Sequence, residues 1–229
     1  HLGSPRNAWR ALSGIRTSWL SREILLVGVL GAGWSVVVVV NAGGVAGPAT
    51  QRALLTALSA MGAALVYAMA RVYRLRTVPA WDTHLTTTAF FLAAGAMGGL
   101  AAALSLSFPG GPDGIEPVRL SAWIGVGTVA LELALEPLWR MHRRRARTRV
   151  DPGLWPDRRP ARWMLRGRVP LLAVSLLFGL GGVVMITVGH GSIGMAVVPP
   201  LLAVAVGAAL GAEVAGRAAF YATHARVGV

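Results

Sequence analysis

Six long apolar stretches dominate this sequence of 229 residues and limit what it can fold into. Each is rich in Gly, Ala, Val and Leu, and each approaches or exceeds the roughly 20 residues that an α-helix needs to cross a bilayer. Only 14% of the residues are charged, too few to cover a soluble surface. We therefore predict an all-α, polytopic integral membrane helical bundle with about six transmembrane helices. The expected spans, in one membrane anchor domain over 1–229, are 24–46, 53–73, 89–108, 120–140, 169–188 and 195–221.

The net charge of +13 comes from arginine, and the arginines gather in alternate connections between the apolar stretches. Twenty of the 22 lie in 1–23, 71–88 and 140–168 or near the C-terminal end, whereas Arg52 and Arg119 lie on the opposite side. Arginine-rich connections stay in the cytoplasm. We therefore expect a multi-pass membrane protein with both ends of this chain cytoplasmic. This explanation is favoured over nucleic-acid binding because the arginines flank apolar spans.

The stretch 140–168 contains eleven arginines and several prolines, which indicates a basic cytoplasmic loop. Such a loop can determine topology and contact anionic lipid headgroups. It can also be a docking surface for an acidic soluble partner, and both interpretations remain open.

The chain contains no cysteine, which excludes disulfides, thiolate zinc sites and Cys-ligated iron–sulfur clusters within it. A membrane-bound haem needs axial histidines on facing helices. All five histidines fall instead in expected loops or at the ends of spans, so we predict no haem and no metal site in this chain. The five histidines are His1, His84, His142, His190 and His224.

Carboxylates within apolar stretches are costly in lipid and therefore suggest a role. Glu132 and Glu136 lie four residues apart on one face of the fourth expected span, and Arg140 follows after another four. This spacing predicts an intrahelical ion pair between Glu136 and Arg140. Glu132 lies deeper, and a proton-relay role is the alternative to a structural one.

Glu213, Arg217 and Tyr221 repeat the same spacing near the end of the last stretch. We predict that Glu213 and Arg217 form an ion pair and that this stripe braces the helix against its neighbours.

Polar and aromatic side chains gather at the expected cytoplasmic rim. A carboxylate, an imidazole, guanidinium groups and aromatic rings suit a quinol, because quinol oxidation releases protons that Glu or His can accept. Trp and Tyr at the ends of spans are otherwise interfacial anchors. The candidate quinol-binding residues are His1, Glu23, Arg71, Trp81, Arg217 and Tyr221, with Glu23 and His1 in the catalytic role.

Three segments resemble the membrane anchor subunit of the dimethyl sulfoxide reductase family, in sequence, order and spacing. They are HLGSPRNAWRAL…SWLSREI (1–24), RVYRLRTVPAWDTHLTTTAFF (71–91) and AEVAGRAAFYATHARVGV (212–229). The resemblance covers nearly the whole chain. Family members usually have eight spans, two of them before the HLGSP motif. The six spans here are therefore expected to belong to a longer precursor that begins upstream.

The resemblance implies a subunit of the bacterial inner membrane, without haem, that oxidises menaquinol in anaerobic respiration. It also implies two partners, an iron–sulfur subunit with four clusters and a molybdopterin catalytic subunit that determines the terminal acceptor. In the family, the histidine of HLGSP and the glutamate of LSxE are implicated in quinol binding, and they correspond to His1 and Glu23. A transporter with a midplane site and a structural tether without quinol chemistry are the alternatives.

Overall fold

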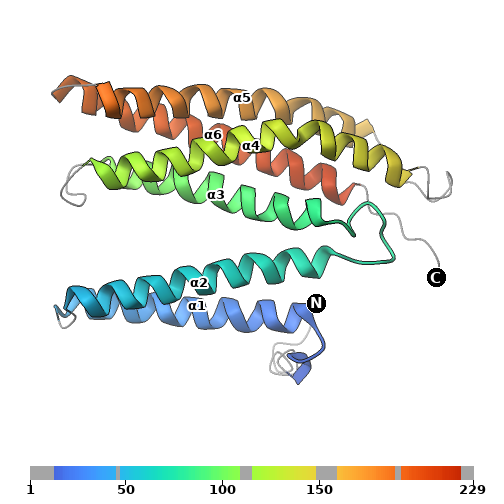
Figure 1. Ribbon diagram of the computed structural model, residues 1–229, viewed down its shortest axis with the longest axis horizontal. Helices are drawn as coiled ribbons and strands as arrows, with labels where there is room; N and C mark the ends of the chain where they lie inside the picture. Colours follow the sequence, from blue (N-terminus) through green and yellow to red (C-terminus); the bar gives the residue numbers. More distant parts are fainter. Residues whose placement is uncertain (1–12, 45–46, 109–114, 148–158, 189–191, 223–229) are drawn as a thin grey trace. The chain divides into compact units, whose positions relative to one another are not determined.

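The computed structural model describes residues 13–44, 47–108, 115–147, 159–188 and 192–222, which contain six α-helices and no strand (Figure 1). All six are long and apolar enough to cross a membrane. The predicted class, an all-α multi-pass membrane protein, is therefore confirmed. The helices are α1 (Trp19–Ala42), α2 (Pro48–Tyr73), α3 (His84–Leu106), α4 (Glu116–Arg147), α5 (Arg159–Val188) and α6 (Ser192–Tyr221).

Each helix begins before the apolar stretch that predicted it, because polar residues at the helix starts are themselves helical. The Ser18 side chain accepts a hydrogen bond from the Ser21 backbone N–H at 3.4 Å, and the Thr83 hydroxyl accepts one from the Leu85 N–H at 3.3 Å. Such caps satisfy N–H groups that have no partner within the helix. As a result, Glu23 lies within α1 rather than in a preceding loop.

The stretch 140–168, expected as a loop, is helical at both of its ends. Helix α4 continues to Arg147, and α5 begins at Arg159 with Pro160 as its second residue. Arginine favours helix, and proline is well tolerated in the first turn. The expected loop is therefore much shorter than its charge pattern indicated.

The chain forms two compact units that meet in sequence at Arg74 and Leu75. The N-terminal unit consists of α1 and α2, which pack together as a helical hairpin. Much of α1 is exposed, including Val38 and Val39, as expected for a surface that faces lipid.

The C-terminal unit, from Leu75 onward, contains α3 to α6. Helix α3 packs on α4, α4 on α5, α5 on α6, and α6 on α3, so the four helices form a closed bundle. Its core contains the completely buried side chains of Leu100, Leu172 and Leu202. The alternating chain direction brings the start of α3, the end of α4, the start of α5 and the end of α6 to one end of this bundle (Figure 1).

Candidate functional site

The N-terminal unit holds an aromatic and cationic cluster where α1 begins and α2 ends. The Trp19 ring has the Arg22 Cζ atom 4.3 Å from its centroid and the Arg71 Cζ atom 5.1 Å from it. The Tyr67 ring meets Trp19 edge to face, with 5.6 Å between the ring centroids. Cation–π and edge-to-face contacts hold these rings and guanidinium groups together.

Glu23 is half-buried and lies one helical turn after Trp19, on the same side of α1. Among the described residues, no arginine forms an ion pair with its carboxylate. The neighbouring Arg22 instead donates hydrogen bonds to the backbone carbonyls of Ile15 and Arg16, both at 2.8 Å. A half-buried carboxylate that forms no ion pair with any described arginine is chemically suited to accept a proton.

The other predicted site residues divide between the two units. Arg71 belongs to the N-terminal unit with Glu23, whereas Trp81, Arg217 and Tyr221 belong to the C-terminal unit. His1 lies outside the described residues.

In the C-terminal unit, Trp81 joins the turn before α3 to the end of α6. Its ring stacks on Phe220 with 4.7 Å between centroids, and its Nε1–H donates to the Phe220 carbonyl oxygen at 3.0 Å. Tyr221 meets Trp81 edge to face at 6.3 Å. The Arg217 Cζ atom lies 3.6 Å from the centroid of the Phe90 ring.

A buried ion cluster lies at the same end of the C-terminal unit. Arg168 of α5 pairs with Glu136 at 2.6 Å and with Glu132 at 3.0 Å, both on α4, and with Glu213 of α6 at 3.4 Å. The sequence predicted that Glu213 pairs with Arg217, which is wrong. The Glu213 carboxylate pairs with Arg168 of the adjacent helix, and the Arg217 guanidinium group lies over the Phe90 ring instead.

Glu136 also accepts hydrogen bonds from Arg140 and Arg143, both at 3.1 Å. The predicted intrahelical pair between Glu136 and Arg140 is therefore confirmed. The ion pair that holds Glu132 to another helix shows a structural role for this carboxylate, and the proton-relay alternative stays a prediction.

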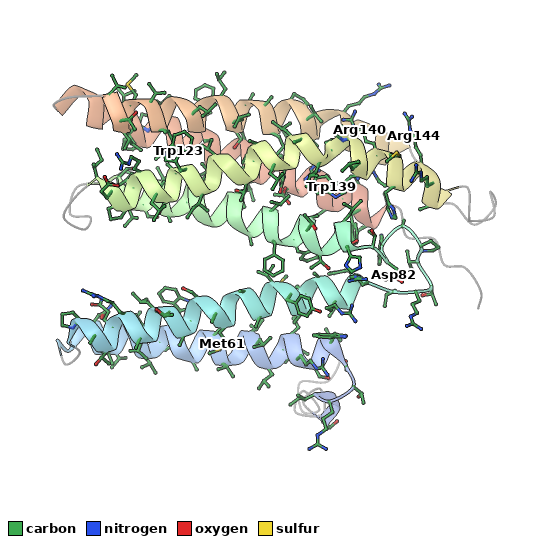
Figure 2. All side chains as sticks on the ribbon, in the orientation of Figure 1. Met61, Asp82, Trp123, Trp139, Arg140 and Arg144 are labelled. Carbon is green, nitrogen blue, oxygen red and sulfur yellow. The ribbon has the colours of Figure 1, made fainter. Side chains whose placement is uncertain are left out.

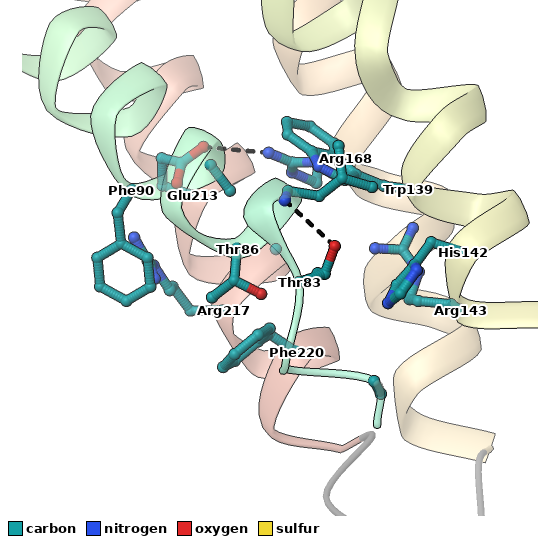
Figure 3. Close-up of a pocket in the computed structure, with 14 residues that line it drawn as sticks. Thr83, Thr86, Phe90, Trp139, His142, Arg143, Arg168, Glu213, Arg217 and Phe220 are labelled. Atoms are coloured by element: carbon teal, nitrogen blue, oxygen red, sulfur yellow. Dashed lines mark hydrogen bonds and ion pairs between the residues drawn. The ribbon is translucent and has the colours of Figure 1, made fainter. Parts of the chain in front are cut away.

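A pocket opens beside this cluster, between α3, α4, α5 and α6 (Figure 3). It encloses about 630 Å³, part of which is open to the surroundings. Arginine, histidine and glutamate side chains and aromatic rings lie on its wall. The residues that line it are Ala80, Thr83, Leu85, Thr86, Ala89, Phe90, Trp139, His142, Arg143, Arg168, Glu213, Gly216, Arg217 and Phe220.

Of the residues in this pocket, sequence reasoning assigned a site role only to Arg217. Arg168 was counted as one of the arginines that determine topology. One signal was present, since the buried pair Glu132 and Glu136 needs more positive charge than Arg140 alone supplies. The sequence around Glu132 and Glu136 does not indicate which arginine supplies this additional positive charge.

Comparison with known proteins agrees with this architecture. The family model described as the DMSO reductase anchor subunit matches residues 1–223. The chain is 29% identical over its full length to a component of the anaerobic dimethyl sulfoxide reductase of Escherichia coli, covering 76% of that protein. It is 34% identical over 129 residues to a subunit of the sulfite dehydrogenase of Allochromatium vinosum, which is 49% of this chain and 38% of that subunit.

No solved structure matches the chain. The family match nevertheless extends from the first residue almost to the last, across all six apolar helices and both units. This multi-pass membrane protein therefore belongs to the family of DMSO reductase anchor subunits.

Proposed function

We propose that this chain is the quinol-oxidising membrane anchor of a bacterial redox complex. It takes electrons from menaquinol and passes them to an iron–sulfur subunit and on to a molybdopterin reductase in anaerobic respiration. Family membership supports the role of membrane anchor, and the names of its relatives, a dimethyl sulfoxide reductase and a sulfite dehydrogenase, support a redox complex.

The proposal rests on the burial of Glu23 and on its lack of an ion pair with a described arginine. Glu23 is half-buried, lies one helical turn after Trp19, and forms no ion pair with a described arginine. Oxidation of a quinol to a quinone releases two electrons and two protons. In the proposed step, Glu23 accepts one proton from a quinol hydroxyl, the second proton passes to water at the membrane surface, and the two electrons leave to the partner's clusters.

The remaining candidate residues have supporting roles in this proposal. His1 is a hydrogen-bond partner of a quinol oxygen, and Arg71 contacts the ring of Trp19, which lies one helical turn before Glu23. The supporting contacts assigned to Trp81, Arg217 and Tyr221 remain predictions from the sequence.

The test is Glu23→Gln, which keeps the size of the side chain and its hydrogen-bonding groups but removes the proton acceptor. We expect the complex to assemble in membranes and quinol-dependent reduction of the acceptor to be lost. A soluble viologen donor, which bypasses the membrane subunit, is expected to drive the catalytic subunit normally. The matched control is Glu116→Gln, because Glu116 is a highly exposed carboxylate at the start of α4.

Normal quinol turnover by Glu23→Gln would show that another group accepts the proton. Saturable quenching of a fluorescent quinol analogue by the wild-type protein separates the proposal from a structural tether, which has no quinol site to saturate.

A further inference from the structure

The pocket of the C-terminal unit is lined by three residues whose side-chain nitrogens are buried and have no hydrogen-bond partner among the described residues. Trp139 Nε1, His142 Nε2 and Arg168 Nε are all buried and without a hydrogen-bond partner among the described residues. An indole N–H and a guanidinium Nε–H can only donate. Both residues are deeply buried, Trp139 being 6% exposed and Arg168 5%.

Buried donors of this kind are unfavourable unless an acceptor satisfies them. Trp139 and Arg168 come from α4 and α5, and their side chains lie against each other, with the Arg168 Cζ atom 5.0 Å from the centroid of the Trp139 ring. His142 follows Trp139 by three residues on α4 and lines the same wall (Figure 3). The pocket therefore suits a ligand that brings oxygen acceptors.

The charges around the pocket favour an anion as this ligand, since Arg143, Arg168 and Arg217 line it with one carboxylate, Glu213. Within the described part of the chain, the cluster balances three carboxylates with three arginines. They are Glu132, Glu136 and Glu213 with Arg140, Arg143 and Arg168.

Arg217 is a fourth arginine and gives the pocket an excess positive charge. It contacts the face of the Phe90 ring and forms no ion pair with a described carboxylate. A neutral acceptor would satisfy the donors but leave this charge unbalanced, whereas an anion satisfies both.

Because the donors come from three helices, they restrict which anion geometry can accept all of their hydrogen bonds. Trp139 lies on α4, Arg168 on α5 and Arg217 on α6, so the acceptor needs oxygens that point in several directions. A tetrahedral phosphate has this geometry, whereas the two oxygens of a carboxylate lie in one plane. The guanidinium group of Arg217 can donate to phosphate in a pair, whereas Arg168 contributes only its Nε–H, because its Nη atoms hold the carboxylates.

We propose that this pocket binds a phosphate group, with Trp139, Arg168 and Arg217 donating to its oxygens. The phosphate belongs either to the headgroup of an anionic phospholipid or to a free phosphate ion, because the two share the same chemistry. This proposal goes beyond quinol oxidation and assigns Arg217 to phosphate instead of to the quinol.

The test measures binding to the full chain, purified in detergent with its co-purifying subunits, by native mass spectrometry. Three probes are compared: phosphatidylglycerol, diacylglycerol with the same acyl chains, and inorganic phosphate. We expect saturable binding of phosphatidylglycerol or of inorganic phosphate, and no specific binding of diacylglycerol. Competition between the two phosphate probes identifies the source, since inorganic phosphate displaces the lipid only if a free ion can fill the pocket.

Trp139→Phe removes the N–H donor and keeps an aromatic ring. It is expected to weaken phosphate binding roughly tenfold, the effect of one hydrogen bond to an anion. The matched control is Trp123→Phe, in which the same change is made on the same helix at an exposed tryptophan near its other end (Figure 2). This control is expected to bind like the wild type.

Arg217→Gln is the second variant, and it carries the test if Trp139→Phe fails to fold. It removes the excess charge and is also expected to weaken binding at least roughly tenfold. Equal binding of phosphatidylglycerol and diacylglycerol together with no binding of inorganic phosphate would overturn the proposal. So would wild-type phosphate affinity in the folded variants.

Discussion

At Arg168, one guanidinium group holds three carboxylates from two neighbouring helices. Glu132 is completely buried and Glu136 nearly so, and charges at such depth need a partner of opposite sign. Arg168 is therefore the residue on which the junction of α4, α5 and α6 depends.

Arg168→Met keeps much of the length of the side chain but leaves two buried carboxylates without this partner. We expect the C-terminal unit to lose about 3–5 kcal/mol of stability, the usual cost of breaking a buried ion pair from one side. The measurement is the thermal unfolding midpoint of the purified chain in detergent, followed by circular dichroism.

The control for this variant is Arg166→Met, because Arg166 is exposed and only two residues away. It is expected to change stability by no more than about 0.5 kcal/mol. Equal midpoints for the two variants would mean that the buried cluster contributes nothing to stability.

At the level of helix packing, the backbones of α3 and α4 lie close together at Gly99. A Cβ atom added there would meet the backbone of Gly125 and the Ser121 carbonyl oxygen, and backbone atoms cannot move aside as a side chain does. Small residues that let helices approach closely are typical of packing in membranes. This contact helps to keep the four-helix bundle closed.

Gly99→Ala is therefore expected to force α3 and α4 apart and to cost about 1–3 kcal/mol, as overpacking does. Gly98→Ala is the matched control one position earlier in α3, where an added Cβ meets nothing within 4 Å. It should leave stability unchanged or raise it slightly, because alanine favours helix over glycine. Thermal unfolding in detergent compares the two, and an equal loss in both would show that helix propensity rather than close packing governs this region.

At the scale of the whole molecule, the charge distribution predicts how the chain is oriented in the membrane. Twenty arginines lie in connections on one side of the expected spans and two on the other. Because positively charged connections remain in the cytoplasm, we expect the turn between α2 and α3 to be cytoplasmic and the start of α2 to face outward.

Single cysteines test this orientation without background, since the chain contains none. Thr77→Cys lies in the turn before α3, and Gln51→Cys lies in the first turn of α2; both positions are exposed. A membrane-impermeant maleimide is expected to label Gln51→Cys in intact cells and Thr77→Cys only after the membrane is opened. The reverse pattern would place the arginine-rich face outside.

Several features of this protein were predictable because they depend on local or summed properties. The free energy of transferring a segment into lipid is roughly the sum of contributions from its residues. The apolar stretches alone therefore predicted an all-α membrane protein with six helices. The pair of Glu136 with Arg140 was equally predictable, because residues four apart on any helix are neighbours.

The pocket and its ion cluster depended on tertiary structure. Eleven arginines lie between 140 and 168, and local spacing cannot tell which one meets Glu132, 36 residues from Arg168 in sequence. For the same reason spacing wrongly paired Glu213 with Arg217 on its own helix. Hydrophobicity and helical periodicity determined which segments enter the membrane. The packing and rotation of α3 to α6 against one another decided which buried charges meet, because an ion pair between helices depends on distances that only the folded bundle sets.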